Sequence, residues 1–204
     1  MRTSSGLKVG ILAEDRTDCD TLKVLVQRML AARGHTASFK HRGKDGAAHL
    51  VRKAKVWMSE LADEGCTVLL LVHDLDRSPA NQMLNDQHAL RVRLDKIPVP
   101  KGVVRYICIP IEELEAWFWS CPNALERIAP GTGKDRVQSS PERLTKPKEA
   151  LIRLSASQRD GKARYTTGQN PELAELLDLE LCARRCPSFR DLHTFLAASV
   201  VSVS

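Results

Sequence analysis

Short apolar runs alternate with amphipathic stretches along the first 120 residues of the chain. The runs are typical of buried strands, and the stretches, whose apolar positions recur every three or four residues, are typical of helices. Strands are predicted over residues 7–13, 36–40, 67–72 and 103–109. Helices are predicted to begin at the caps Thr17 and Asp45, to run weakly over about 80–95, and to return briefly over 113–119. This alternation predicts a parallel sheet with crossover helices.

The pattern changes after Cys121. Residues 122–146 are rich in Pro, Gly, Ser and charge, which predicts a loop or an irregular segment. Helices are predicted to follow over about 147–156, 171–184 and 188–200. We therefore expect an α/β protein with a mostly parallel sheet flanked by helices. Its core would cover residues 1–121, and a basic loop and helical extension over residues 122–204 would pack on that core.

Positive charge is concentrated in the middle of the chain. The net charge is +6, and residues 122–170 hold 10 basic and 5 acidic residues, a net of +5. A basic segment of this kind is typical of proteins that bind a phosphate-bearing partner. It is equally typical of a solvated, flexible surface, so both interpretations stay open.

Several classes of protein are disfavoured by composition. The longest unbroken aliphatic run, residues 68–72, is far shorter than the ~20 apolar residues that cross a bilayer, so no membrane partner is expected. The N-terminus has too few apolar residues before its first acids for a secretory signal, which makes the cytoplasm the expected compartment. The six cysteines lie mostly in apolar segments without paired spacing, which indicates buried thiols rather than a zinc site.

Acidic residues follow three of the predicted strands. Glu14 follows the first strand, Asp74 and Asp76 follow the third, and Glu112 and Glu115 follow the fourth. Ligands of open parallel sheets bind outside the carboxyl ends of the strands, so these side chains are expected to converge. Alternation along an extended segment sends the two aspartates to the same side.

Carboxylates that converge repel one another, and a bound cation is the usual reason for such a cluster. Oxygen ligands favour Mg²⁺ or Mn²⁺, and two such ions can clamp the attacking and leaving oxygens of a phosphodiester. The alternative is that strand-to-helix loops carry acids as helix caps, a role that suits Asp15 and Asp18.

Glu14 after one strand and Asp74-Leu75-Asp76 after another resemble the Toprim domain. This is the metal-binding module of topoisomerases, DnaG-type primases and the overcoming-lysogenization-defect nucleases. Toprim strands usually end in Glu-Gly, and Asp15 here replaces the glycine. The match covers about residues 7–120, and it implies a Toprim/Rossmann-like sheet with Mg²⁺ or Mn²⁺ as cofactor.

A narrower resemblance extends over nearly the whole chain. Its marks are the segment Ile109–Trp117, the stretch Lys146–Lys148, Tyr165 and Pro187–Phe189, which look like a family of small Toprim-like bacterial proteins. Such proteins are associated with phage defence and are paired with an ATPase of the ABC/SMC type. The resemblance implies a metal-dependent nuclease effector that acts on DNA or RNA.

This resemblance assigns roles to the strand-end acids. Catalysis would fall to Glu14, Asp74, Asp76, Glu112 and Glu115. Metal binding would fall to Glu14, Asp18, Asp74, Asp76 and Glu112. In a helix that begins near Glu112, Glu112 and Glu115 are three apart, share a face and would orient water. The alternative is a solvated helical start favoured by the helix dipole.

Basic residues border the same edge and are candidates for contacts with nucleic-acid phosphates. They are Arg16, Lys44 and Arg77, which surface charge explains equally well, and Lys146 and Lys148, which lie in the net-basic segment. His73 precedes the acidic pair, and alternation turns it away from that pair, so a packed or hydrogen-bonded histidine is expected.

Two other functions share parts of this pattern. A phosphoryl-receiver domain needs Thr or Ser after the fourth strand and Lys after a fifth, and neither is present. The other rival is a non-catalytic Toprim-like subunit that binds nucleic acid or protein within an ATPase complex. Apolar positions near the C-terminus could cover the core or form a homo-oligomer interface; they are Leu192, Phe195, Leu196 and Val200.

Overall fold

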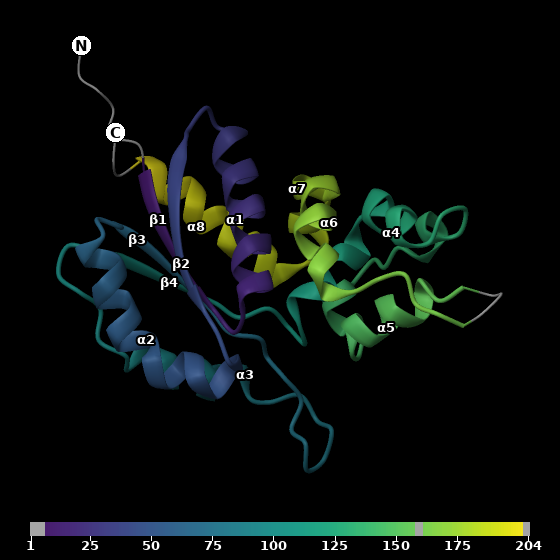
Figure 1. Ribbon diagram of the computed structural model, residues 1–204, viewed down its shortest axis with the longest axis horizontal. Helices are drawn as coiled ribbons and strands as arrows, with labels where there is room; N and C mark the ends of the chain where they lie inside the picture. The colour runs from purple at the N-terminus through teal and green to yellow at the C-terminus, as the bar shows by residue number, and fades with distance from the viewer. Residues whose placement is uncertain (1–6, 158–160, 202–204) are drawn as a thin grey trace.

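Four parallel strands form the centre of the protein. The computed structural model describes residues 7–157 and 161–201, so residues 1–6, which begin the segment judged for a secretory signal, lie outside it. The strands are β1 (Leu7–Ala13), β2 (Ala37–Gly43), β3 (Val68–Val72) and β4 (Val104–Cys108). They pair in the order β2-β1-β3-β4, with every pair parallel (Figure 1). The predicted α/β, Rossmann-like class is confirmed.

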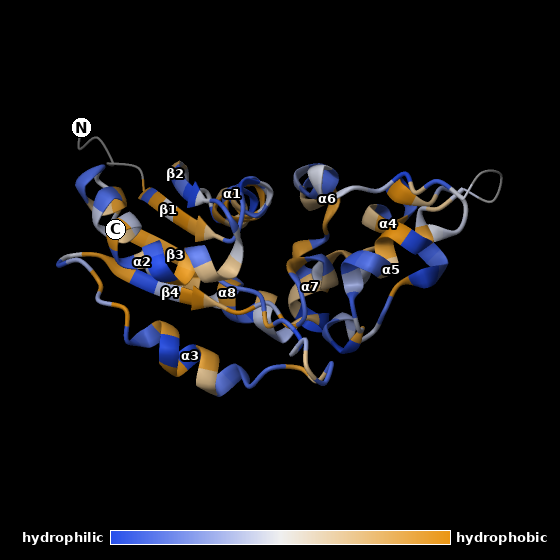
Figure 2. Ribbon diagram, turned by 60° about the horizontal axis from the view of Figure 1, so that its bottom comes forward, coloured by the Kyte–Doolittle hydropathy of each residue, from blue (hydrophilic) through white to orange (hydrophobic). Residues whose placement is uncertain are grey.

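Helices cover both faces of this sheet. Helices α1 (Arg16–Ala31) and α8 (Pro187–Val201) pack on one face, and α2 (Gly46–Asp63) and α3 (Gln87–Asp95) pack on the other (Figures 1 and 2). No helix within residues 7–157 and 161–201 is long and apolar enough to span a bilayer.

The central strand β3 is buried on both faces, because helices cover the sheet from both sides. Val68, Leu70 and Val72 belong to the core on the α1 side, and Leu69 and Leu71 belong to the core on the α2 side. All five side chains are buried. A strand that is buried on both faces reads as an unbroken apolar run, which is the pattern that predicted it.

Gly43 brings α1 close to the end of β2. A Cβ atom at this position would lie 2.3 Å from the Asp15 carbonyl oxygen and 2.7 Å from Cys19 Sγ. Only a residue without a side chain permits that approach. The first turn of α1 is therefore held against the sheet edge where β1 ends.

Short helices beside the sheet form the extension and the segment that leads into it (Figure 1). The 3-10 helices are η1 (Leu114–Ser120), η2 (Gly133–Arg136), η3 (Pro141–Arg143) and η4 (Thr167–Gln169). The α-helices are α4 (Pro122–Ile128), α5 (Pro147–Leu154), α6 (Asn170–Leu176) and α7 (Leu179–Arg185).

Three predicted elements differ from the structure. Residues 122–146 are not wholly irregular, because Ala124, Leu125 and Ile128 bury one face of α4. The helix predicted over 171–184 is two helices, because Asp178 interrupts it and caps α7 by accepting a hydrogen bond from Leu181 N at 2.8 Å. The weak helix over 80–95 begins only at α3, since Arg77 and Leu84 pair in an antiparallel bridge before it.

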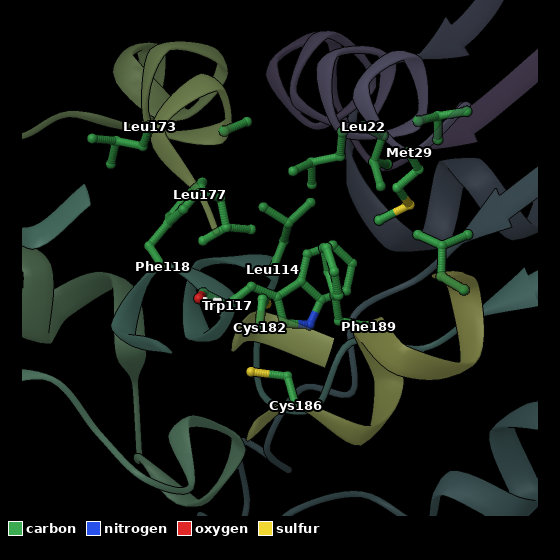
Figure 3. Packing of buried hydrophobic residues seen from close by; sticks show 14 of the residues in the cluster. Leu22, Met29, Leu114, Trp117, Phe118, Leu173, Leu177, Cys182, Cys186 and Phe189 are labelled. Carbon is green, nitrogen blue, oxygen red and sulfur yellow. Dashed lines mark hydrogen bonds between the residues drawn. The ribbon is translucent and has the colours of Figure 1, made fainter. Parts of the chain in front are cut away.

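One hydrophobic cluster joins the extension to the sheet. Figure 3 shows Leu22 of α1, Leu114 and Trp117 of η1, Leu173 of α6 and Phe189 of α8 packed together. The rings of Trp117 and Phe189 meet edge to face with centroids 5.1 Å apart. Packing against α1, α6 and α8 therefore sets the position of η1 and of the acids beside its start.

The C-terminal helix α8 covers β4 with the apolar positions predicted for it. Leu192 and Leu196 are fully buried, and the ring of Phe195 stacks on Tyr106 of β4 with centroids 4.5 Å apart. The side chain of Val200 lies outside the described residues.

Candidate active site at the strand ends

Pairing between β3 and β4 continues beyond both strands. His73 N donates to Cys108 O at 3.1 Å, and Leu75 N donates to Pro110 O at 2.8 Å. This keeps residues 73–76 extended, with Leu75 buried in the core on the α2 side. Asp74 and Asp76 alternate with Leu75 and stay outside that core.

Glu14 lies directly beside this segment. Its Oε1 accepts a hydrogen bond from Asp74 N at 3.2 Å and lies 3.5 Å from His73 Nδ1. Burial, and then the charge of Asp76, raise the pKa of Glu14 to about 7. His73 is buried and contacts the Asp74 carbonyl oxygen at 2.8 Å, and burial lowers its pKa. A packed, hydrogen-bonded histidine was expected at this position.

The first turn of α1 adds a second acid. Asp15 has extended backbone angles and is the N-cap, accepting a hydrogen bond from Asp18 N at 2.9 Å. The prediction that Thr17 caps this helix is therefore wrong, since Thr17 is already inside it. Burial, followed by the charges of Asp15, Glu115 and Glu14, raises the pKa of Asp18 to about 8. Asp18 thus joins the cluster, whereas Asp15 has the capping role.

Asp74 is the centre of the acidic group. Burial raises its pKa well above the usual range, and the charges of Asp18, Glu115 and Glu14 add to the effect. Asp76 lies at the rim, where partial burial raises its pKa, His73 lowers it and Glu113 raises it. These three acids come from two segments far from Asp74 in sequence, residues 14–18 and the start of η1.

Glu115 enters the group from η1. It is only 4% exposed, and its Oε1 accepts hydrogen bonds from Asn170 Nδ2 at 3.1 Å and from Tyr165 OH at 3.5 Å. The Tyr165 hydroxyl also donates to Asn170 Oδ1 at 2.7 Å. Burial raises the pKa of Glu115, and the Asn170 bond opposes that rise. Tyr165 therefore helps to position Glu115.

Glu112 does not share a helical face with Glu115. The helix begins at Leu114, Glu113 is extended, and Glu112 has a left-handed backbone with φ of 67°. Both Glu112 carboxylate oxygens accept from Arg77, one of them from Nε at 3.0 Å. The three-residue spacing rule applies only inside a helix, so the expected grouping of Glu112 with Glu115 is wrong.

Glu113 is a member of the site that the sequence analysis missed. Its carboxylate lies 2.9 Å from Lys148 Nζ and accepts Lys148 N at 3.0 Å. Burial disfavours the charge on Lys148, but the contacts with Glu113 raise its pKa overall. The sequence signal for Glu113 was its place next to Glu112. The two carboxylates bind different basic residues, Glu112 binding Arg77 and Glu113 binding Lys148.

The other predicted nucleic-acid contacts are placed differently. Arg16 pairs with Asp20 on the exposed side of α1, and Lys44 lies 3.8 Å from Asp45. Lys146 lines a hollow of about 400 Å³ together with Asp76, Arg77, Glu112 and Glu113. A second hollow of about 350 Å³ is lined by Asp74, His73, Arg93 and again by Asp76. Asp76 is thus the acid shared by the two hollows at this edge.

The donor set suits a hard divalent cation, because it consists of carboxylate oxygens. Within residues 7–157 and 161–201, no three Asp, Glu, His or Cys side chains are arranged as a ready metal site. Donor chemistry therefore fits Mg²⁺ or Mn²⁺.

Comparison with known proteins yields one match. A family model described as "Domain of unknown function (DUF4276)" matches residues 13–197. No curated protein and no solved structure matches the chain. The matched range contains the acidic cluster and most of the helical extension.

Proposed function

The chain belongs to the family described as "Domain of unknown function (DUF4276)", and we propose from its own side chains that it is a Mg²⁺- or Mn²⁺-dependent phosphodiester hydrolase acting on DNA or RNA. The observation that carries the proposal is the charge coupling at Asp74. Asp18, Glu115 and Glu14 all act on this half-buried carboxyl and raise its pKa. A cluster of mutually repelling acids at a sheet edge is a typical binding site for a divalent cation.

The ion would be held by Glu14, Asp18, Asp74 and Asp76. Glu115 takes the place first expected for Glu112, whose oxygens are engaged by Arg77. When bound, Mg²⁺ or Mn²⁺ neutralises charge on the phosphodiester and favours the ionised form of water. The raised pKa values of the acids would fall as the ion offsets their repulsion.

The protein's own groups account for proton transfer and substrate positioning. Glu115, held beside Asp74 by Asn170 and Tyr165, would orient water and accept its proton. The oxygen of that water would bond to phosphorus as the phosphorus–oxygen ester bond breaks, and the leaving oxygen would take up a proton. Lys148 and Arg77 lie beside the acids and are placed to contact non-bridging phosphate oxygens.

The wider setting is proposed from the resemblance. The strand-end acids Glu14, Asp74 and Asp76 resemble the Toprim pattern of the overcoming-lysogenization-defect nucleases. On that basis we place the protein as an effector subunit in anti-phage defence, partnered by an ABC/SMC-type ATPase in the cytoplasm. All six cysteines are free and buried, which supports a reducing compartment.

A second candidate function is a non-catalytic Toprim-like subunit that binds nucleic acid or protein within an ATPase complex. The observation that favours it is the absence, among the described residues, of three side chains already arranged around a metal position.

The test of the proposed function is an Asp74→Asn variant, which removes one charge with almost no change in shape. We expect Mn²⁺ affinity, measured by calorimetry, to fall by at least about tenfold. Cleavage of labelled DNA and RNA oligonucleotides in Mn²⁺ is expected to fall to the level seen in EDTA. The matched control is Asp95→Asn, which lies on α3 and faces Arg105.

Equal Mn²⁺ affinity and equal cleavage in the Asp74→Asn and wild-type proteins would overturn the assignment. The second candidate would be favoured by a wild-type protein that binds Mn²⁺ and nucleic acid but cleaves neither DNA nor RNA, whether alone or with its partner ATPase.

A further inference from the structure

A hollow in the extension is lined by apolar groups and by two arginines. Its volume is about 540 Å³, within the ~300–1,000 Å³ typical of small-molecule sites. The apolar part of its wall is formed by Trp119, Leu144 and Leu154. Its positive charge comes from Arg136 and Arg153. None of its described lining residues is acidic, unlike the two hollows beside the acid cluster.

The two guanidinium groups have no acidic partner in the part of the chain that the structure describes. Arg42, Arg77, Arg105 and Arg127, by contrast, each form an ion pair with a carboxylate. An unpaired arginine pair in an acid-free hollow attracts an anion, and a phosphate suits the planar guanidinium donors.

The walls of this hollow are joined to one another. Gln138 N donates to Trp119 O at 2.8 Å, which anchors the segment after Arg136 on η1. Trp119 Nε1 donates to Pro147 O at 3.2 Å, which anchors η1 on the start of α5. Arg136 and Arg153 therefore extend from segments that are tied to the same 3-10 helix.

Two elements lead from the acid cluster to this hollow. Along η1, Glu115 and Trp119 are four residues apart, a rise of ~8 Å at ~2.0 Å per residue. Along α5, Lys148 and Arg153 are five residues apart, a rise of ~7.5 Å at ~1.5 Å per residue. Both elements therefore span less than ~10 Å between the acid cluster and the hollow.

We infer that the hollow is a subsite for one nucleotide of a single nucleic-acid strand, with Arg136 and Arg153 on its phosphate. The subsite lies on the same strand as the bond positioned at Asp74, at the side where η1 and α5 lead away from the acids. This inference rests on the proposed function, because it takes nucleic acid as the substrate. The apolar wall formed by Trp119, Leu144 and Leu154 would face the sugar and base.

The experiment measures binding separately from cleavage. A fluorescein-labelled single-stranded 12-mer, as DNA and as RNA, is titrated in EDTA with wild type and Arg136→Gln/Arg153→Gln. We expect at least about tenfold weaker binding by the variant. The salt dependence should fall by about 1.4 in log–log slope, since each lost phosphate contact on a single strand contributes ~0.7.

The matched control is Arg184→Gln/Arg190→Gln, which removes two exposed arginines from α7 and α8 and should bind like wild type. Arg136→Lys/Arg153→Lys keeps the charge and should recover part of the affinity. Thermal unfolding curves of all variants are compared to show that the fold is retained.

Equal affinity and equal salt slope in the Gln pair and the control pair would overturn the subsite, and so would a wild type that binds neither oligonucleotide. A wild type whose binding depends on these arginines, yet which never cleaves in Mn²⁺, would reject hydrolysis and support the subsite. Mn²⁺-dependent cleavage with binding unaffected in the Gln pair would reject the subsite alone.

Discussion

At the scale of single residues, repulsion among the carboxylates of the acid cluster destabilises the metal-free protein. Glu14 and Asp18 have pKa values of about 7 and about 8, against ordinary values of 4.5 and 3.8. Between about pH 4 and pH 8 these two carboxyl groups therefore hold more protons in the native chain than in the unfolded chain. Stability falls with rising pH wherever the native state holds the excess, so this cluster destabilises the fold most above pH 8.

The Asp18→Asn substitution should reverse part of this effect. In EDTA, we expect its free energy of unfolding to match that of the wild type near pH 4. The variant should become increasingly more stable than the wild type as pH rises to about 8, because it lacks a charge that must form next to Asp15, Glu115 and Glu14. Urea unfolding at a series of pH values measures the difference.

Asp18→Glu serves as the control, since it keeps the charge and should keep the pH dependence of the wild type. A difference between the Asn variant and the wild type that stays constant from pH 4 to pH 8 would show that Asp18 does not sit among other acids.

At the scale of elements, two aspartates at helix starts behave differently. Asp15 has extended backbone angles and its side chain bonds to Asp18 N, which satisfies a free amide of the first turn of α1. Asp45 precedes α2 in a left-handed conformation and makes no capping bond with its side chain. The predicted side-chain cap at Asp45 is therefore wrong, although the predicted helix is present.

Substitution by Ser and by Ala should separate these two cases. Both replacements at Asp15 remove its charge, and only Ser can cap, so Asp15→Ala is expected to be less stable than Asp15→Ser by about 0.5–2 kcal/mol. The same pair at Asp45 should differ far less. Urea unfolding of the four variants gives both differences, and equal stability of the two Asp15 variants would contradict the capping role.

At the scale of the whole molecule, the sheet and the extension share one hydrophobic cluster (Figure 3). Leu22 and Met29 of α1 and Leu173 of α6 belong to it, and α8 returns from the extension to cover the sheet. A chain cut at residue 121 would lose α8 and expose the face of the sheet that this helix covers. The core over 1–121 and the extension over 122–204 are thus expected to fold together.

Leu173→Ala tests this cooperation. The side chain is fully buried, so its truncation should cost about 2–5 kcal/mol. We expect circular dichroism and tryptophan fluorescence to report one coincident, shifted urea transition. Ile152→Ala, at an exposed position of α5, should shift it little. A dichroism transition that stays at the wild-type midpoint while fluorescence shifts would show that the sheet folds independently of the extension.

Local patterns in the sequence determined the sheet and the place of its first acids. Apolar runs and helical periodicities are read from neighbouring residues, and they located β1 and β3 with Glu14 and Asp74 at their ends. Parallel strands end at one edge whatever the detailed packing, so the convergence of those acids follows from the pattern alone.

Only the tertiary structure decided how the fourth strand's acids are used. Glu115 is held by Asn170, 55 residues away, and Glu112 by Arg77, 35 residues away. These partners lie in loops and short helices without a repeating pattern, where neither spacing nor periodicity specifies an orientation. The packing of Trp117 against other helices sets the direction in which each glutamate points, and packing of that kind joins residues that no local pattern connects.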